Sequence, residues 1–299
     1  MEIRVLRYFL AVAQEEGITR AAELLHITQP TLSRQIAQLE EEMGVPLFDR
    51  GTRKLVLTSE GLLLRRRAEE ILELVDKTER EVTGQGEQIA GTVSVGCGDL
   101  DAVQVLPELF RGFRARYPAV NFELYTATAD HIKERMERGL TDVGLLLEPV
   151  DMEQYDYIRL TRGEEWVVLL PPESPLAKLE QITPRDLRGV PLILPRRLSV
   201  QSELARWFGE EYEHLNVVLT SNLTSNSAVM SHCGLACAVA IRGSISFWDP
   251  ARILCRPLFP TLKATSVLAW RRKQPFGAAA GRFIQYARQT LKEEGQAAL

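Results

Sequence analysis

The chain has 299 residues, roughly twice the length of a typical domain, so we expect more than one folded unit. Its composition, 45% hydrophobic and 25% charged, is that of a globular protein and excludes a disordered chain. The net charge of -4 excludes a uniformly basic polyanion binder but allows a local basic surface.

The early apolar stretch and the cysteines both favour a cytoplasmic protein. Arg4, Arg7 and Glu15 interrupt residues 1–17, so we expect neither a signal peptide nor a membrane span there. The four cysteines are too scattered for a disulfide framework and fit a reducing compartment. They are Cys97, Cys233, Cys237 and Cys255.

The first 60 residues predict three helices followed by a small hairpin. An amphipathic helix at 3–15 precedes a short Ala-rich helix, and Thr28 is expected to cap a third helix with Pro30 in its first turn. The core face of the third helix is predicted to carry Leu32, Ile36, Leu39 and Met43. Its opposite face is short and polar, and could lie in a groove of DNA. PLFDRGTRKLVLT then reads as a hairpin with Gly51 at the turn, a candidate wing.

A long helix is predicted from Ser59 to about residue 84. Its apolar positions follow a 4-3-4-3-4 spacing that is typical of a coiled-coil seam. They are Leu64, Ala68, Ile71, Val75, Thr78 and Val82. We favour a dimer coiled coil, and packing of the seam on the helix's own domain is the alternative.

After a glycine-rich linker at 84–91, strands and helices alternate in a way that indicates a parallel α/β sheet. The expected elements are strands at 92–96, 120–125, 143–147, 166–170, 192–194, 217–219, 235–240 and 266–270, and helices at 103–116, 130–138, 224–232 and 278–293.

The segment ITRAAELLHITQPTLSRQIAQLEEEMGVPLFDRGTRKLVLTSEG resembles the winged helix-turn-helix of the LysR-type transcriptional regulators in residues and spacing. The long helix, the GTVSVG strand, PPESPLAK and RFIQYARQTL follow the order of that family, so the resemblance covers essentially the whole chain. It implies an α+β multidomain fold with a winged helix-turn-helix, a linker helix and a two-lobed, periplasmic-binding-protein-like (type 2) effector domain. The expected domains are 1–58 (helix-turn-helix about 18–37), 59–88 and 89–299, with lobe I at 89–161 and 268–299 and lobe II at 162–267.

The resemblance implies a bacterial DNA-binding regulator whose recognition helix enters the major groove. By position, the DNA contacts are expected from Gln29, Pro30, Thr31, Ser33 and Arg34 on the helix, and from Arg50 and Arg53 on the wing. The implied partners are double-stranded DNA, a small-molecule effector, RNA polymerase and further copies of the chain in a homodimer or homotetramer, with no membrane partner.

The effector is expected between the lobes, where strands end and helices begin. The candidate residues are Cys97, Gly98, Asp99, Leu100, Thr126, Thr128, Ser199, Val200, Gln201, Ser221, Asn222 and Leu223. Ordinary turn and capping roles are the alternative for each of them. If Asp99 and Asp101 both face the cleft, they favour a polyol, sugar-like or amine-bearing effector over a carboxylate.

Competing functions have weaker support. Gly96-Cys97-Gly98 lacks the third glycine of a dinucleotide fingerprint, and His232, Cys233 and Cys237 lack a fourth metal ligand. No hydrolase, P-loop or paired-carboxylate motif is present. We therefore expect no enzyme, cofactor or metal. The alternatives are a solute-binding module and an enzyme that uses Cys97 as nucleophile.

Overall fold

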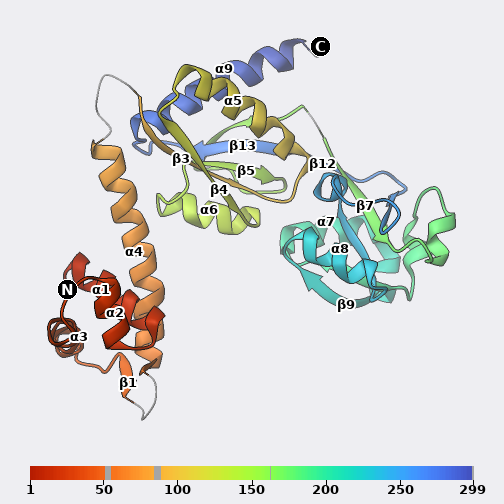
Figure 1. Ribbon diagram of the computed structural model, residues 1–299. Coiled ribbons are helices and arrows are strands. Elements are labelled where there is room, and N and C mark those ends of the chain that lie inside the picture. The colour runs from red at the N-terminus through yellow and green to blue at the C-terminus, as the bar shows by residue number, and fades with distance from the viewer. Residues whose placement is uncertain (51–54, 84–88, 162, 298–299) are drawn as a thin grey trace. The chain divides into compact units, whose positions relative to one another are not determined.

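The computed structural model describes residues 1–299 except 51–54, 84–88, 162 and 298–299 (Figure 1). The chain divides into two compact units, Met1–Val82 and Thr83–Leu299. Each unit is described by itself.

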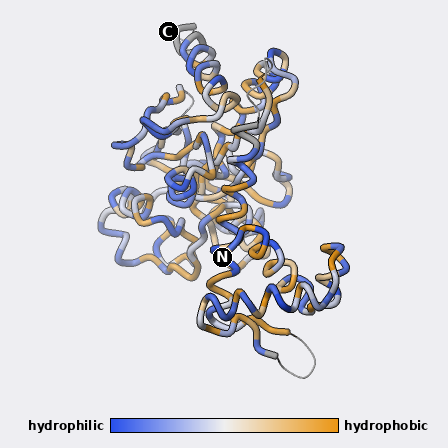
Figure 2. The backbone as a smooth tube through the Cα atoms, turned by 90° about the vertical axis from the view of Figure 1, so that its left-hand side faces the viewer, coloured by the Kyte–Doolittle hydropathy of each residue, from blue (hydrophilic) through white to orange (hydrophobic). Residues whose placement is uncertain are grey.

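The smaller unit is a helical domain with a two-stranded hairpin. Its elements are α1 (Ile3–Glu15), α2 (Ile18–Leu24), α3 (Gln29–Met43), β1 (Phe48–Arg50), β2 (Leu55–Leu57) and α4 (Ser59–Thr83). Strands β1 and β2 pair antiparallel, as expected for the wing, whose tip lies outside the described residues. Hydrophilic and hydrophobic residues alternate along the helices (Figure 2), so each helix can turn one face to a small core and the other to solvent.

The core of this unit corrects one expectation for α3. Leu32, Ile36 and Leu39 are buried, but Met43 at the end of the helix is 38% exposed. Met43 is the last residue of α3, and Gly44, with φ 70°, ends the helix directly after it.

The seam expected on α4 does not form one continuous exposed stripe. Ala68 is fully buried and Leu72 nearly so, both in the core of the smaller unit, while Ile71 and Leu74 are exposed. The alternative in which α4 packs on its own domain therefore holds for the face that carries Ala68 and Leu72. Ile71 of the predicted seam stays exposed, together with Leu74.

The first lobe of the larger unit, lobe I, has a five-stranded sheet in the order β4-β3-β5-β13-β6. Its elements are β3 (Gly91–Cys97), α5 (Leu106–Arg116) after a 3-10 turn (Asp101–Val105), β4 (Val120–Thr126), α6 (Ala129–Glu137), β5 (Val143–Leu147), β6 (Tyr155–Arg159), β13 (Ser266–Arg271) and α9 (Ala278–Ala297). Strand β3 runs parallel to β4 and β5, whereas β13 is antiparallel to β5 and β6. One core cluster joins the sheet to α5 and α9, and another joins it to α6 (Figure 1).

The second lobe, lobe II, is built on the strand order β11-β7-β10-β8-β9, with β12 pairing with the start of β7. Its elements are β7 (Glu164–Leu170), β8 (Pro191–Pro195), α7 (Leu198–Phe208), β9 (Asn216–Ser221), α8 (Thr224–His232), β10 (Cys237–Ile241), β11 (Leu254–Pro257) and β12 (Lys263–Ala264), with 3-10 turns at Pro175–Lys178, Pro184–Leu187, Gly209–His214 and Arg242–Ile245. Helices α7 and α8 contribute to different core clusters on this sheet.

The two lobes are joined by adjacent chain segments. Strand β12 pairs with β7 through Ala264 and Glu164, immediately before β13 returns to lobe I at Ser266. The carboxylate of Glu164 is buried and accepts hydrogen bonds from the backbone N–H groups of Asp101 (3.0 Å) and Ala102 (2.9 Å) and from Ser266 Oγ (2.9 Å). Glu164, at the start of lobe II, is therefore hydrogen-bonded both to the turn that follows β3 and to Ser266, where the chain returns to lobe I.

Candidate functional site

The helix-turn-helix consists of α2 and α3. Ala21 and Ala22 of α2 are buried, and their small side chains let the neighbouring helices approach closely. Thr28 occupies the N-cap position of α3, but its hydroxyl contacts Thr31 Oγ1 (2.8 Å) instead of capping a backbone N–H. The helix is positioned by its buried face and by Pro30 in its first turn.

The outer face of α3 presents the residues expected to contact DNA. Gln29, Pro30, Thr31 and Arg34 are exposed, and Ser33 is half-buried. Arg34 is long enough to reach a guanine edge or a phosphate. This face can therefore enter a groove of DNA without rearrangement of the core.

The wing is anchored to α3 through Glu40. Its Oε1 accepts hydrogen bonds from the backbone N–H groups of Leu47 (2.8 Å) and Phe48 (3.1 Å). Arg50 closes β1, but its side chain and the whole of Arg53 lie outside the described residues. Glu40, part of an acidic run in the sequence, thus has a structural role.

A cavity of about 90 Å³ lies between the two lobes of the larger unit. Helix starts from both lobes converge on it, since Thr128 precedes α6, Arg197 precedes α7 and Leu223 precedes α8. The walls are largely apolar. This is the arrangement expected of a small-molecule site.

Most of the expected effector residues line this cavity: Gly98, Asp99, Leu100, Thr128, Val200, Ser221, Asn222 and Leu223. Four do not. Cys97 is buried inside β3, Thr126 is exposed, Gln201 donates its amide to Pro195 O (2.9 Å), and Ser199 has a buried hydroxyl in the first turn of α7.

The cavity has further lining residues that were not predicted from the sequence: Ala127, Ala129, Leu145, Leu147, Trp166, Pro195, Arg196, Arg197, Thr224, Ser227, Val239, Ala240 and Ile241. Leu147 and Ile241 end β5 and β10, so the rule that ligands lie at strand ends points to them. No local signal indicates Trp166, which stands near the beginning of β7.

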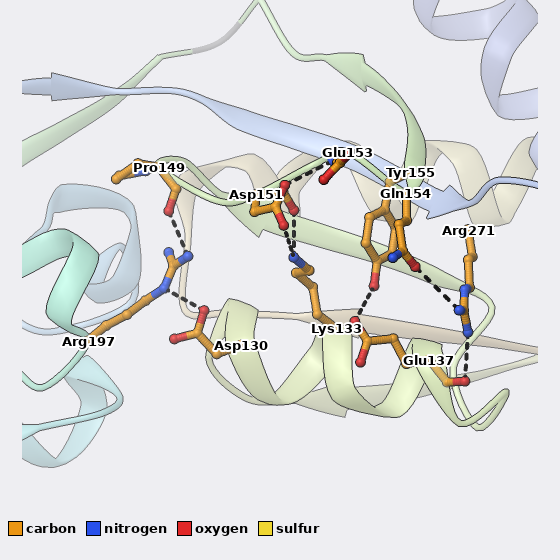
Figure 3. Close-up of polar contacts among 10 residues, drawn as sticks. All are labelled: Asp130, Lys133, Glu137, Pro149, Asp151, Glu153, Gln154, Tyr155, Arg197 and Arg271. Atoms are coloured by element: carbon orange, nitrogen blue, oxygen red, sulfur yellow. Dashed lines mark hydrogen bonds and ion pairs between the residues drawn. The ribbon is translucent and has the colours of Figure 1, made fainter.

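Arg197 crosses from lobe II to lobe I (Figure 3). Its guanidinium donates to Asp130 Oδ1 (3.1 Å) and to the carbonyl oxygens of Leu147 (2.9 Å) and Pro149 (2.7 Å), and its side chain is only 9% exposed. Lys133, on the same helix as Asp130, donates to Asp151 O (2.6 Å) and so fixes α6 to the segment that follows β5. The contacts of Arg197 therefore hold the two lobes together at this side of the cavity.

The two carboxylates that follow β3 have different surroundings. Asp99 lines the cavity and accepts hydrogen bonds from Ser225 of lobe II, at 3.3 Å from Oγ and 3.4 Å from N. Asp101 does not line the cavity, and its Oδ1 accepts from Gln104 Nε2 (2.6 Å). The condition that both carboxylates face the cleft is therefore not met.

The weaker motifs have structural explanations. A Cβ built on Gly96 would lie 2.5 Å from a side-chain carbon of Ile132, so this glycine lets α6 pack on β3. Burial raises the pKa of the Cys97 thiol, the opposite of what an activated nucleophile needs. His232 Nδ1 lies 2.9 Å from Arg252 O.

Neither a metal-ligand cluster nor a membrane-spanning helix occurs among the described residues. In the ranges that the structure describes, no three His, Cys, Asp or Glu side chains are grouped as metal ligands. No helix in those ranges is both long enough and apolar enough to cross a bilayer.

Comparison with known proteins identifies two matching family models. Residues 3–62 match "Bacterial regulatory helix-turn-helix protein, lysR family", and residues 86–292 match "LysR substrate binding domain". The chain is 34% identical over 280 residues to the Hca operon transcriptional activator HcaR of Escherichia coli K12, covering 91% of this chain and 92% of that protein. It is 28% identical over 295 residues to the uncharacterized HTH-type transcriptional regulator YybE of Bacillus subtilis 168, covering 98% of this chain and 97% of that protein.

Solved structures share the fold over nearly the whole chain. CbnR, described as a LysR family transcriptional regulator, matches with a TM-score of 0.76 and 24% identity, covering 97% of this chain and 99% of that one. Full-length CbnR complexed with its target DNA matches with a TM-score of 0.75 and 23% identity at the same coverage.

Proposed function

Because the chain belongs to the LysR family of transcriptional regulators, we propose that its interlobe cavity binds the small molecule that switches its activity on DNA. The protein is a DNA-binding regulator with an effector-binding domain and not an enzyme. The observation that carries the proposal is the apolar cavity on which helix starts from both lobes converge. A ligand there contacts both lobes at once, and its binding energy can shift their equilibrium.

The DNA interface proposed is the exposed face of α3, with Gln29, Pro30, Thr31, Ser33 and Arg34 in the major groove. Arg50 and Arg53 are proposed to contact the flanking backbone or minor groove from the wing. The exposure of the α3 residues supports this assignment. Two copies related by a two-fold axis then read a dyad-symmetric site with half-sites about one helical turn, ~34 Å, apart.

The domain limits proposed are 1–58 for DNA binding, 59–88 for the linker helix and 89–299 for effector binding. We further propose that the chain acts in the cytoplasm, where it assembles into a homotetramer from two dimers and contacts RNA polymerase at its promoters. Its relative HcaR is named a transcriptional activator, which supports the contact with polymerase.

Filling the cavity tests the effector site. Val200 is buried in the cavity wall on α7, whereas Leu198 on the same helix is 78% exposed. Val200→Trp is expected to abolish the response of a promoter reporter to an activating compound found in a metabolite screen, and Leu198→Trp to retain it. The near-UV circular dichroism spectrum and the Tm of Val200→Trp serve as the folding control, because Val200 lies in the core of the larger unit. A full response from a folded Val200→Trp protein would place the effector elsewhere.

A further inference from the structure

Lobe I contains a second cavity, of about 360 Å³, which shares no lining residue with the interlobe cavity. It lies between the 3-10 turn after β3, the first turn of α5, the end of β6 and α9. We call it the hinge cavity, because its wall includes Leu160 and Thr161, through which the chain leaves lobe I. It has more than twice the roughly 150 Å³ of a cavity that binds benzene, so a small organic molecule with one ring fits inside it.

The hinge cavity adjoins the hydrogen bonds that connect the lobes. Ala102, in its wall, donates its backbone N–H to Glu164 Oε1 (2.9 Å), and Glu164 begins β7 of lobe II. Leu160, also in the wall, donates its backbone N–H to Ser266 O (2.9 Å), where the chain returns to lobe I. A molecule that contacts Ala102 and Leu160 therefore stabilises the arrangement in which these bonds are formed.

One part of the cavity wall is apolar and the other is polar. The apolar residues are Ala102, Val105, Ile158, Leu160 and Leu291. The polar residues are Gln104, Glu108, Arg159 and Thr161. This division fits a ligand with an apolar body and one polar group.

The uncompensated charge in the polar part is that of Glu108. Arg159 is already paired, since its Nε and Nη2 donate to the Glu148 carboxylate at 3.0 and 2.7 Å. Among the described residues, the Glu108 carboxylate has no hydrogen bond or ion pair, although Arg111 stands at the i+3 position, a spacing at which charges pair on a helix. The charge that the wall offers to a ligand is therefore negative.

The neighbouring polar groups add acceptors. Gln104 Nε2 donates to Asp101 Oδ1 (2.6 Å), so the amide oxygen of Gln104 is the group that can serve a ligand. The Thr161 hydroxyl also has lone pairs. A primary ammonium group carries three donors and a positive charge, and it matches this set of oxygens.

The first turn of α5 supplies an alternative role for Glu108. A carboxylate there is favoured by the helix dipole, whatever lies beside it. The dipole does not account for the cavity next to the carboxylate or for its apolar wall. An amine ligand accounts for all three.

We propose that the hinge cavity binds a primary amine with an apolar body, that Glu108 holds the ammonium group, and that the ligand stabilises the hydrogen bonds joining the lobes. This site is separate from the proposed effector site, and the inference does not rest on it.

Three probes with the same cyclohexyl body test the proposal on the full chain. They are cyclohexylmethanamine, cyclohexylmethanol and cyclohexanecarboxylate. Calorimetry should show the amine binding about tenfold tighter than the alcohol, the equivalent of one hydrogen bond to a charged group, and the carboxylate binding weakest. The preference for the amine should shrink as salt screens the exposed carboxylate.

NMR spectra of methyl-labelled protein locate the probe. The amine should shift methyl resonances of Ile158 and Leu291 in the hinge cavity and leave those of Val200 and Val239 in the interlobe cavity unchanged. Hydrogen exchange of the Ala102 amide should slow in the complex.

Matched variants test the role of Glu108. Glu108→Gln keeps the shape of the side chain but removes its charge, and should make the amine and the alcohol bind alike. Glu123→Gln is the control, because it removes the same charge from an exposed position on β4 outside the cavity, and should retain the tenfold preference. Thr161→Trp, at an exposed position on the rim, should block all three probes. The comparison of amine with alcohol is made within each variant, so it does not depend on equal stability of the variants.

Several results would overturn the inference. These are a carboxylate that binds as tightly as the amine, an amine preference that survives Glu108→Gln, or no binding of any probe at millimolar concentration. Shifts confined to Val200 and Val239 would place the amine in the interlobe cavity and equally refute the site. Unchanged exchange of the Ala102 amide in the complex would refute the effect on the connection between the lobes.

Discussion

Arg197 Nε lies 3.1 Å from Asp130 Oδ1, so a residue at the start of α7 in lobe II is bonded to the first turn of α6 in lobe I. The same guanidinium also donates to two carbonyl groups that follow β5. A lysine cannot reproduce this planar set of donors, because its ammonium group is a single point of charge.

We therefore expect Arg197→Lys to loosen the contact between the lobes. Losing charge-assisted bonds from a buried guanidinium should cost about 2 kcal/mol in the unfolding of the larger unit. Thermal denaturation would show this as a lower Tm, and hydrogen exchange would rise at the start of α6. The exposed neighbour is the control: Arg196→Lys should leave both measurements unchanged. Equal Tm values for the two variants would contradict the structural role of Arg197.

Glu164→Gln tests the buried carboxylate between the lobes. Glu164 accepts three hydrogen bonds, and the amide group of glutamine would turn a donor toward donors. The cost should be about 1–3 kcal/mol, seen as a lower denaturation midpoint and faster exchange of the Ala102 amide. Glu165→Gln is the control, because Glu165 forms a more exposed ion pair with Arg242. A midpoint that moves no further for Glu164→Gln than for Glu165→Gln would refute this account.

Arg34→Ala is expected to weaken specific DNA binding by roughly 1–3 kcal/mol, because it removes a long donor from the exposed face of α3. Arg66→Ala on α4 removes the same charge from an exposed position outside that face. Titrations of a selected dyad site against random DNA should show a lower specificity ratio for Arg34→Ala alone. Equal specificity ratios for the two variants would show that Arg34 is not part of the recognition surface.

Dimerisation is expected to require Ile71 and Leu74, which are 37% and 43% exposed on α4 while Ala68 and Leu72 face their own domain. Ile71→Asp combined with Leu74→Asp would bring like charges together where two α4 helices pair. Sedimentation should then show dissociation and weaker binding to the dyad site. Val56→Asp, at a 59% exposed position on β2, is the control for an added charge in the sedimentation experiment only, because β2 belongs to the proposed DNA-binding wing. An undiminished assembly in the double variant would rule out this face of α4.

Acid should destabilise the larger unit through Glu148. Hydrogen bonds from Arg159 (2.7 and 3.0 Å), together with one from Thr265, hold the pKa of the Glu148 carboxyl below its ordinary value of 4.5. Since the folded pKa is depressed, the stabilisation is present above pH 4.5 and is lost as the pH falls through the folded pKa. Glu148→Gln should therefore lower stability at neutral pH and flatten the Tm profile below pH 4.5. A Tm profile of Glu148→Gln that runs parallel to that of the parent below pH 4.5 would show that another group causes the loss of stability in acid.

The core face of the recognition helix and the residues at the strand ends could be predicted from the sequence, because helical periodicity and the order of strands and helices are local patterns. Leu32, Ile36 and Leu39 share one face through the 3.6-residue period, and they are buried. Ser221 and Leu223 follow a strand and precede a helix, and they line the cavity. The same local rule failed for Met43, the last residue of α3, which is 38% exposed, because periodicity gives the face of a helix but not how far the core extends along it.

The order and periodicity of the elements follow from local sequence patterns, and the motif spacing indicates the family. The side chains that meet across the cavity are brought together only when the two lobes pack. Arg197 and Asp130 are 67 residues apart, and no local pattern records that they touch. Asp99 and Asp101 look alike in sequence, yet one lines the cavity and the other turns toward Gln104.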